Sequence, residues 1–138
     1  MHRYAHVLGI IVLLAWAPAA PAHAQSAHET AIRDVISHQL EAMNRGDGTA
    51  AFAFASPMIQ SMFGDAPTFM RMVEMGYPQV YRSRGHRFLK LDAGDDGRLV
   101  QRVLVESDAG TVVARYEMVE IDGRWRINGC SIEKAEGA

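Results

Sequence analysis

The sequence predicts an α+β domain in which N-terminal helices pack on a curved, four-stranded antiparallel sheet. In the first part of the chain, apolar residues recur at spacings of three and four, which is typical of amphipathic helices. From His86 onward they alternate with polar residues, which is typical of strands with one buried face. Because the helices precede the strands instead of alternating with them, we expect the helices to lie on one face of the sheet.

Length and composition limit the possible functions. The chain has 138 residues, of which 49% are hydrophobic and 22% charged, so it is long and apolar enough for one domain with a core. Its net charge of -2 gives no reason to expect nucleic-acid binding, which needs a basic face. The only cysteine, Cys130, excludes an internal disulfide, so stability must come from the core.

Residues 1–24 are typical of a secretory signal peptide. A short basic start at His2 and Arg3 precedes an almost wholly apolar run, and Ala22-His23-Ala24 has the small residues of a cleavage site. The apolar run is shorter than the ~20 residues that span a bilayer. We therefore expect an exported protein, periplasmic or secreted, with a single domain over residues 25–138 and no membrane contact after cleavage.

The longest predicted helix covers residues 27–45. Its apolar stripe consists of Ile32, Val35, Ile36, Leu40 and Met43. Ser26 and Glu29 have the spacing of a capping box, and Gly46 is a suitable stop.

Shorter helices are expected over residues 50–55, 58–63 and 69–75. Ser56-Pro57 and Asp65-Ala66-Pro67 each place a capping side chain just before a proline, which is a helix-start signal. Tyr77-Pro78 begins an extended link.

The predicted strands are residues 86–92, 98–106, 111–120 and 124–133. Asp122-Gly123 between the last two is a strong signal for a two-residue hairpin turn. That turn places Glu120 opposite Trp125, Met118 opposite Ile127, and Tyr116 opposite Gly129.

An even-length turn before the third strand pairs Leu99 with Met118, Gln101 with Tyr116, Val103 with Ala114, and Val105 with Val112. These pairings place the eight paired residues, most of which are apolar, on the face that the helices should cover. The other face collects charged residues and some apolar ones: Arg98, Arg102, Arg115, Arg124, Arg126, Glu117, Asn128, Val100, Leu104, Val113, Val119, Cys130 and Ile132. A slip by one residue would bury the arginines, so we expect this parity to hold.

The order of elements resembles the nuclear-transport-factor-like (cystatin-like α+β) superfamily, in which a cone of helices closes against a curved sheet. Ala51-Phe52-Ala53-Phe54-Ala55-Ser56-Pro57, Phe63-Gly64, Gly76-Tyr77 and Gly123-Arg124-Trp125-Arg126-Ile127-Asn128-Gly129-Cys130 resemble an exported bacterial family known only as a domain of unknown function. The resemblance covers nearly all of residues 25–138. Its motifs are aromatics, glycines and a helix-starting proline, so it implies a fold and no activity.

We expect a non-enzymatic binding protein that holds a small apolar ligand in the cone or a protein partner on the sheet. Neutral polar groups in an apolar concavity are what a ligand pocket uses to fix orientation. The candidate ligand-binding residues are Gln39, Tyr77, Tyr81, Gln101, Tyr116 and Trp125. The alternative is that Gln39 and Gln101 satisfy each other or buried backbone groups.

A second reading is an isomerase- or hydrolase-like enzyme with its active site in the cone. Such an enzyme needs a carboxylate base that faces the cavity. The inward positions of the three assignable strands carry no mid-strand Asp, Glu or His, and Glu120 lies at a strand end. We therefore predict no catalytic residue and no cofactor.

The charged sheet face predicts a partner surface, because arginine mixed with apolar residues is typical of interfaces. Its candidate residues are Arg98, Arg102, Arg115, Glu117 and Arg126. The resemblance implies pairing through this face, so a homodimer is expected.

Metal binding and a reactive thiol are further alternatives. Thioethers of Met70, Met72 and Met75 could bind copper, although residues two apart do not share a helix face. The histidines are too few for zinc, and no metal site is predicted. Cys130, expected opposite Arg115, is either a reactive thiol or a small apolar filler.

Overall fold

The computed structural model describes residues 21–94, 96 and 98–134. Its elements are α1 (Pro21–Asn44), α2 (Gly48–Ala53), α3 (Pro57–Phe63), α4 (Ala66–Gly76), α5 (Pro78–Tyr81), β1 (Ser83–Ala93), β2 (Leu99–Ser107), β3 (Gly110–Ile121) and β4 (Arg124–Lys134). Most of the predicted signal peptide, residues 1–20, lies outside the described residues.

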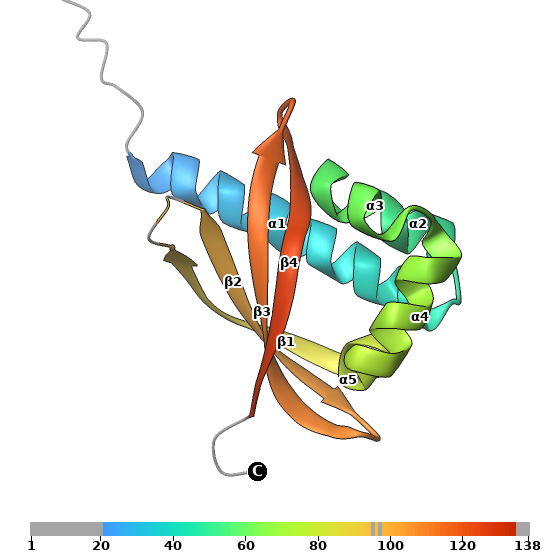
Figure 1. The fold of residues 1–138 in the computed structure, drawn as a ribbon. Helices are drawn as coiled ribbons and strands as arrows, with labels where there is room; N and C mark the ends of the chain where they lie inside the picture. The colour runs from blue at the N-terminus through green and yellow to red at the C-terminus, as the bar shows by residue number, and fades with distance from the viewer. Residues whose placement is uncertain (1–20, 95, 97, 135–138) are drawn as a thin grey trace, which may run out of the picture.

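The structure confirms the α+β prediction. The sheet is open and antiparallel, with its strands in the order β1-β2-β3-β4. Figure 1 shows α1 crossing one face of the sheet, with α2 to α5 gathered around its C-terminal half. No helix in the described ranges is both long enough and apolar enough to cross a membrane.

The helices α2, α3 and α4 each begin just after a capping side chain, and the caps of α3 and α4 are those that the sequence predicts. Asp47, Ser56 and Asp65 accept hydrogen bonds from the backbone N–H groups of Ala50, Ile59 and Thr68, at 3.1, 3.3 and 2.8 Å. The side chains thereby satisfy donors that the first helical turn leaves free. Proline follows the cap in the first turn of both α3 and α4, where its missing N–H costs nothing.

Two local predictions are wrong. The helix begins at Pro21, so Ser26 lies inside α1 and does not form a capping box; its carbonyl accepts a hydrogen bond from the Thr30 hydroxyl at 3.1 Å. The link expected to be extended after Tyr77 forms α5, because Pro78 is preset for the first helical turn.

The central strand pair has the predicted register. All four predicted pairings between β2 and β3 are present, from Leu99–Met118 to Val105–Val112. Asp122 and Gly123 have φ values of 52° and 75°, as a two-residue hairpin turn requires.

The β3–β4 pair keeps its predicted register only near the turn. Glu120 pairs with Trp125 and Met118 with Ile127, but the register shifts at the next step. Glu117 pairs with Gly129 and Tyr116 with Cys130, which leaves Asn128 as the extra residue of a β-bulge. The predicted Tyr116–Gly129 and Arg115–Cys130 pairings are therefore wrong.

The bulge reverses the parity of the rest of β4. Cys130 and Ile132, expected among the arginines, pack against the core under the helices. Glu133 moves to the outer face, where Arg102 and Arg115 meet it at 3.1 and 3.5 Å. One inserted residue thus exchanges the faces of the part of β4 that follows it, residues 129–134.

The core lies between α1 and the inner face of β2 and β3, as predicted. Its largest fully buried side chains are Tyr116, Ile32, Ile36, Leu40, Met118, Gln101, Val103, Val105 and Ser56. Each buried aliphatic side chain contributes about 1.5–3 kcal/mol to folding. Arg102 and Arg115 lie on the opposite face and keep over a third of their side chains exposed.

Candidate functional site

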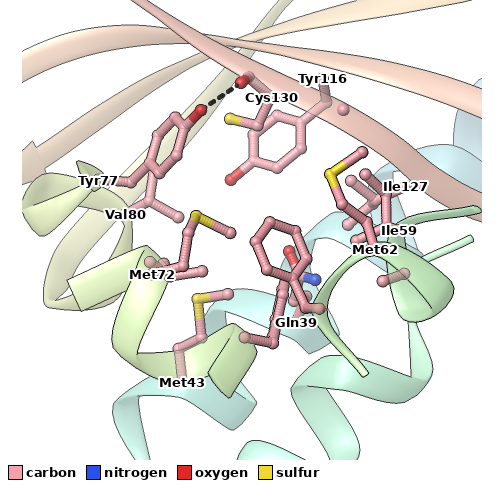
Figure 2. Close-up of a pocket in the computed structure, with 15 residues that line it drawn as sticks. Gln39, Met43, Ile59, Met62, Met72, Tyr77, Val80, Tyr116, Ile127 and Cys130 are labelled. Carbon is pink, nitrogen blue, oxygen red and sulfur yellow. Dashed lines mark hydrogen bonds between the residues drawn. The ribbon is translucent and has the colours of Figure 1, made fainter. Parts of the chain in front are cut away.

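An apolar pocket of about 210 Å³ lies between the helices and the C-terminal strand pair. Figure 2 shows it between the strands on one side and the helices on the other. Its lining residues come from α1, α3, α4, α5, the connecting segments and the two strands: Gln39, Met43, Ala55, Ile59, Met62, Phe63, Phe69, Met72, Val73, Tyr77, Val80, Tyr116, Ile127, Gly129 and Cys130. None of them carries a formal charge at neutral pH.

The wall formed by α3 is attached to β4 next to the bulge. The backbone N–H of Ser56 donates to the carbonyl of Ile127 at 2.8 Å, and the N–H of Ile127 donates to the carbonyl of Phe54 at 2.9 Å. The Ser56 hydroxyl donates to Oδ1 of Asn128 at 2.7 Å while also capping α3. Asn128, which the bulge leaves without a strand partner, therefore helps to position α3 as one wall of the pocket.

The opposite wall is attached to the same strand by Tyr77. Its hydroxyl donates to the carbonyl of Cys130 at 3.0 Å, which is the dashed line in Figure 2. Burial raises the pKa of the Tyr77 hydroxyl, so this donor stays protonated at neutral pH. Both walls thus depend on the path that β4 takes through its bulge.

Tyr116 supplies the polar group that faces the cavity. Only 1% of the residue is exposed, and its hydroxyl has no hydrogen-bond partner among the described residues. Figure 2 shows this hydroxyl pointing from β3 toward the helices, into the pocket. Burial raises its pKa well above the usual value, so the group is a neutral donor under physiological conditions.

Gln39 contributes a second neutral polar group. The residue is 2% exposed and reaches the pocket from α1. Its Nε2 donates to the carbonyl of Ala51 at 3.1 Å, so part of its role is to satisfy a buried backbone group of α2.

Cys130 is half-buried and packs against the core. Burial raises its pKa to about 12, so the thiolate form is rare at neutral pH. A register without the bulge would place Arg115 opposite Cys130, where its guanidinium could activate the thiol. In the structure Arg115 pairs with Ser131 instead. The geometry therefore favours Cys130 as a small apolar residue that fills space over Cys130 as a reactive thiol.

The other three predicted ligand-binding residues lie elsewhere. Tyr81 borders a separate surface hollow beside Gly48 and Met70. Gln101 is fully buried, and its Nε2 donates to the carbonyl of Leu89 at 3.0 Å, where the register of β1 is irregular. Trp125 lies near the β3–β4 turn, with its ring 5.4 Å from that of His28.

The structure thus brings together Gln39, Tyr77 and Tyr116 and separates the remaining three. Four further lining residues are not predicted by the sequence: Met43, Met62, Met72 and Cys130. For Cys130 a signal existed, because a glycine inside a strand, here Gly129, is typical of a bulge. For the methionines, helical spacing alone does not say which turn faces a cavity.

The methionines proposed for copper point to different places. Met72 lines the pocket, Met70 borders the hollow with Tyr81, and Met75 is 84% exposed. Within the part of the chain that the structure describes, no group of three or more His, Cys, Asp or Glu is placed to hold a metal ion.

The outer sheet face carries most of the predicted partner surface. Arg98 pairs with Glu117 and, at 3.0 Å, with Asp96. Arg102 and Arg115 share Glu133. Arg126 differs, because its guanidinium donates to the carbonyl of Ala53 at 3.1 Å on the helical side.

A shallow outer hollow of about 220 Å³ lies behind the pocket, across the sheet. Arg115, Glu117 and Ser131 border it, and Gly129 and Cys130 line both this hollow and the inner pocket. At the bulge, the two faces are therefore separated only by the strand itself.

No curated protein sequence matches the chain. A family model described as "Domain of unknown function (DUF4864)" matches residues 25–138, which is most of the chain and includes every residue of the pocket. The protein that carries this bulge-shaped pocket therefore belongs to the DUF4864 family.

Proposed function

We propose that this protein is an exported, non-enzymatic carrier or receptor for a small, neutral, apolar molecule that presents one hydrogen-bond acceptor. The observation that carries the proposal is the buried hydroxyl of Tyr116, which has no protein partner among the described residues and points into an apolar cavity. A buried polar group without a partner costs about 1–3 kcal/mol, and a ligand acceptor at that position removes the cost.

The size of the pocket limits the ligand class. Apolar cavities of about 150 Å³ in other proteins bind benzene, so about 210 Å³ suits a single ring with a short substituent. The uncharged lining excludes ionised ligands, since a buried charge without a partner is strongly disfavoured. The flexible thioethers of Met43, Met62 and Met72 suit a ligand of irregular shape.

The lining also favours binding over catalysis. A base or nucleophile must be available near neutral pH, and none of the lining residues is a carboxylate, an imidazole or an amine. Burial raises the pKa of both the Tyr116 phenol and the Cys130 thiol, so both stay protonated at neutral pH. Tyr116 is therefore better suited to donate a hydrogen bond than to act as a base, and Cys130 is better suited to fill space than to act as a nucleophile.

The broader assignments belong to the same proposal. A helical layer on one face of an antiparallel sheet, with a pocket between them, supports placing the fold in the nuclear-transport-factor-like superfamily. Export is supported by the signal-peptide pattern of residues 1–24. Mass spectrometry of the protein from a periplasmic extract should give a mature chain that begins at Gln25; an uncleaved chain in the cytosol would contradict export.

A partner on the outer face is a second candidate function. Four of its charged residues, Arg98, Arg102, Arg115 and Glu117, lie beside the half-buried Val100 and Leu104. This face leaves apolar area between ion pairs, as interfaces do. Light scattering at micromolar concentration should give a dimer mass, and a monomer mass would contradict self-association through this face.

The ligand proposal is tested with two probes of the same shape. Acetophenone carries a carbonyl oxygen where α-methylstyrene carries a CH₂ group, so only acetophenone can accept a hydrogen bond. We expect acetophenone to bind the wild-type protein about tenfold more tightly than α-methylstyrene, measured by calorimetry, because one hydrogen bond to a buried donor is gained.

Tyr116→Phe is the matched variant. It should bind α-methylstyrene at least as tightly as acetophenone, because the acetophenone carbonyl then has no donor. Its free energy of unfolding without ligand should be unchanged or up to about 1 kcal/mol higher, since the unpartnered hydroxyl is gone. A pocket that binds neither probe, or a variant that still prefers acetophenone, would contradict the proposal.

A further inference from the structure

Met62 combines two properties that the other exposed methionines do not share. It is 63% exposed, and it also lines the apolar pocket. Met58 and Met75 are 51% and 84% exposed but lie outside the pocket lining. Met43 lines the pocket but is only 4% exposed. Figure 2 shows the thioether of Met62 over the cavity, on the side of Ile59 and Ile127.

The position of Met62 on α3 explains this combination. Ile59 and Phe63 of the same helix also line the pocket, and Met62 lies between their face and the solvent. Its sulfur can therefore meet a water-soluble oxidant, while its side chain forms part of the surface that an apolar ligand contacts.

We propose that Met62 is an oxidation site that controls ligand affinity, an inference that rests on the proposed ligand-binding function. The oxidant is a peroxide. The thioether sulfur gives an electron pair to one peroxide oxygen, the S–O bond forms and the O–O bond breaks. The proton on the transferred oxygen passes to the departing hydroxide, so the products are methionine sulfoxide and water.

Oxidation changes the pocket at its mouth. The sulfoxide is a strong polar acceptor in place of an apolar, polarisable thioether. The neighbours of Met62 in the pocket wall, Ile59, Phe63 and Ile127, offer no side-chain donor to the sulfoxide. The modified side chain must therefore either turn to solvent and open the wall or enter the cavity and occupy the unpartnered Tyr116 hydroxyl and the space of the ligand, and both weaken binding.

The test treats the whole protein with dilute hydrogen peroxide and locates each sulfoxide by peptide mass spectrometry. We expect Met62, Met58 and Met75 to oxidise well before Met43. The affinity for α-methylstyrene, measured by calorimetry, should fall about tenfold as Met62 is modified, because a polar group then borders the bound probe. Methionine sulfoxide reductase should restore the affinity.

Leucine variants assign the effect to one residue, because leucine has nearly the same volume and cannot be oxidised. Met62→Leu should keep its affinity after peroxide treatment, whereas Met58→Leu and Met75→Leu should lose it as the wild type does. Failure of the untreated protein to bind would overturn the ligand proposal itself. Binding that survives modification of Met62, a Met62→Leu variant that still loses affinity, or the absence of sulfoxide at Met62 would overturn the oxidation site alone.

Discussion

Two of the three strand pairs in the sheet differ by one inserted residue, and the pocket lies beside that residue. The β2–β3 ladder is regular from Leu99 to Ser107, and its inner face is buried except at the ends of β2, where Leu99 and Ser107 are half-buried. The β3–β4 ladder contains the extra residue Asn128, and beyond it the inner face borders a cavity. A regular ladder packs its side chains at fixed spacing, whereas a bulge bends the strand and frees polar groups that can attach other elements.

The largest effect is expected in the regular ladder. Met118→Ala removes a side chain that is 1% exposed and pairs with Leu99, so it should lower the free energy of unfolding by about 2–5 kcal/mol. Denaturant unfolding measures the change. The control is Arg102→Ala on the outer face of β2, whose exposed ion pair with Glu133 should cost at most about 1 kcal/mol.

Equal destabilisation of Met118→Ala and Arg102→Ala would contradict this prediction. That result would mean that the inner and outer faces of β2 and β3 are not distinguished by burial.

A smaller effect is expected at the bulge. Asn128→Ala leaves the Ser56 hydroxyl without its acceptor and should lower the free energy of unfolding by about 1–3 kcal/mol. Ser56→Ala removes that bond together with the cap of α3 and should cost about 0.5–2 kcal/mol.

The double variant sharpens this prediction. Because the two side chains share one hydrogen bond, its cost should fall short of the sum of the single costs by at least about 0.5 kcal/mol. Purely additive costs would show that Asn128 does not hold α3. Acetophenone affinity should fall in Asn128→Ala as well, since α3 forms one wall of the pocket.

The effect expected at Cys130 is absent at neutral pH and confined to alkaline pH. Burial raises the pKa of the Cys130 thiol from its ordinary value of 9.0 to about 12, so folding favours the protonated thiol. Its contribution to stability is complete below about pH 9 and is lost as the pH rises toward 12.

Stability measured against pH should therefore fall more steeply for the wild type than for Cys130→Ala over this range, by at most about 1.4 kcal/mol per pH unit. Parallel curves would mean that the thiol is not desolvated. Below pH 8 the difference between the two proteins should be constant, which separates the loss of packing from titration.

Much of this fold follows from local sequence rules. The predicted capping residues Ser56 and Asp65 and the Asp122-Gly123 turn act through nearest neighbours, so their predictions succeed. The β2–β3 register also follows, because an even turn and a strict alternation allow only one pairing that keeps the arginines out of the core.

The site follows only in part, because alternation specifies a face and not a position along it. Alternation predicts the same inner face for Gln101 and Tyr116, yet Gln101 satisfies the irregular backbone of β1 while Tyr116 reaches the pocket. Alternation predicts the wrong face for the end of β4, because the contact between the extra residue Asn128 and Ser56 joins positions that lie far apart in sequence.

Asn128 also has a consequence for anyone who alters the exposed surface of this protein. Its Oδ1 holds Ser56 at the start of α3, while its Nδ2 donates to Oε1 of Glu117 on the other side of the sheet, at 3.5 Å. Glu117 in turn is held by Arg98. Replacing Glu117 or Arg98 to attach a label, a tag or a neutral side chain therefore alters the surroundings of a side chain that also contacts the start of α3, so this solvent-facing patch is a poor choice for engineering that must leave the interior untouched.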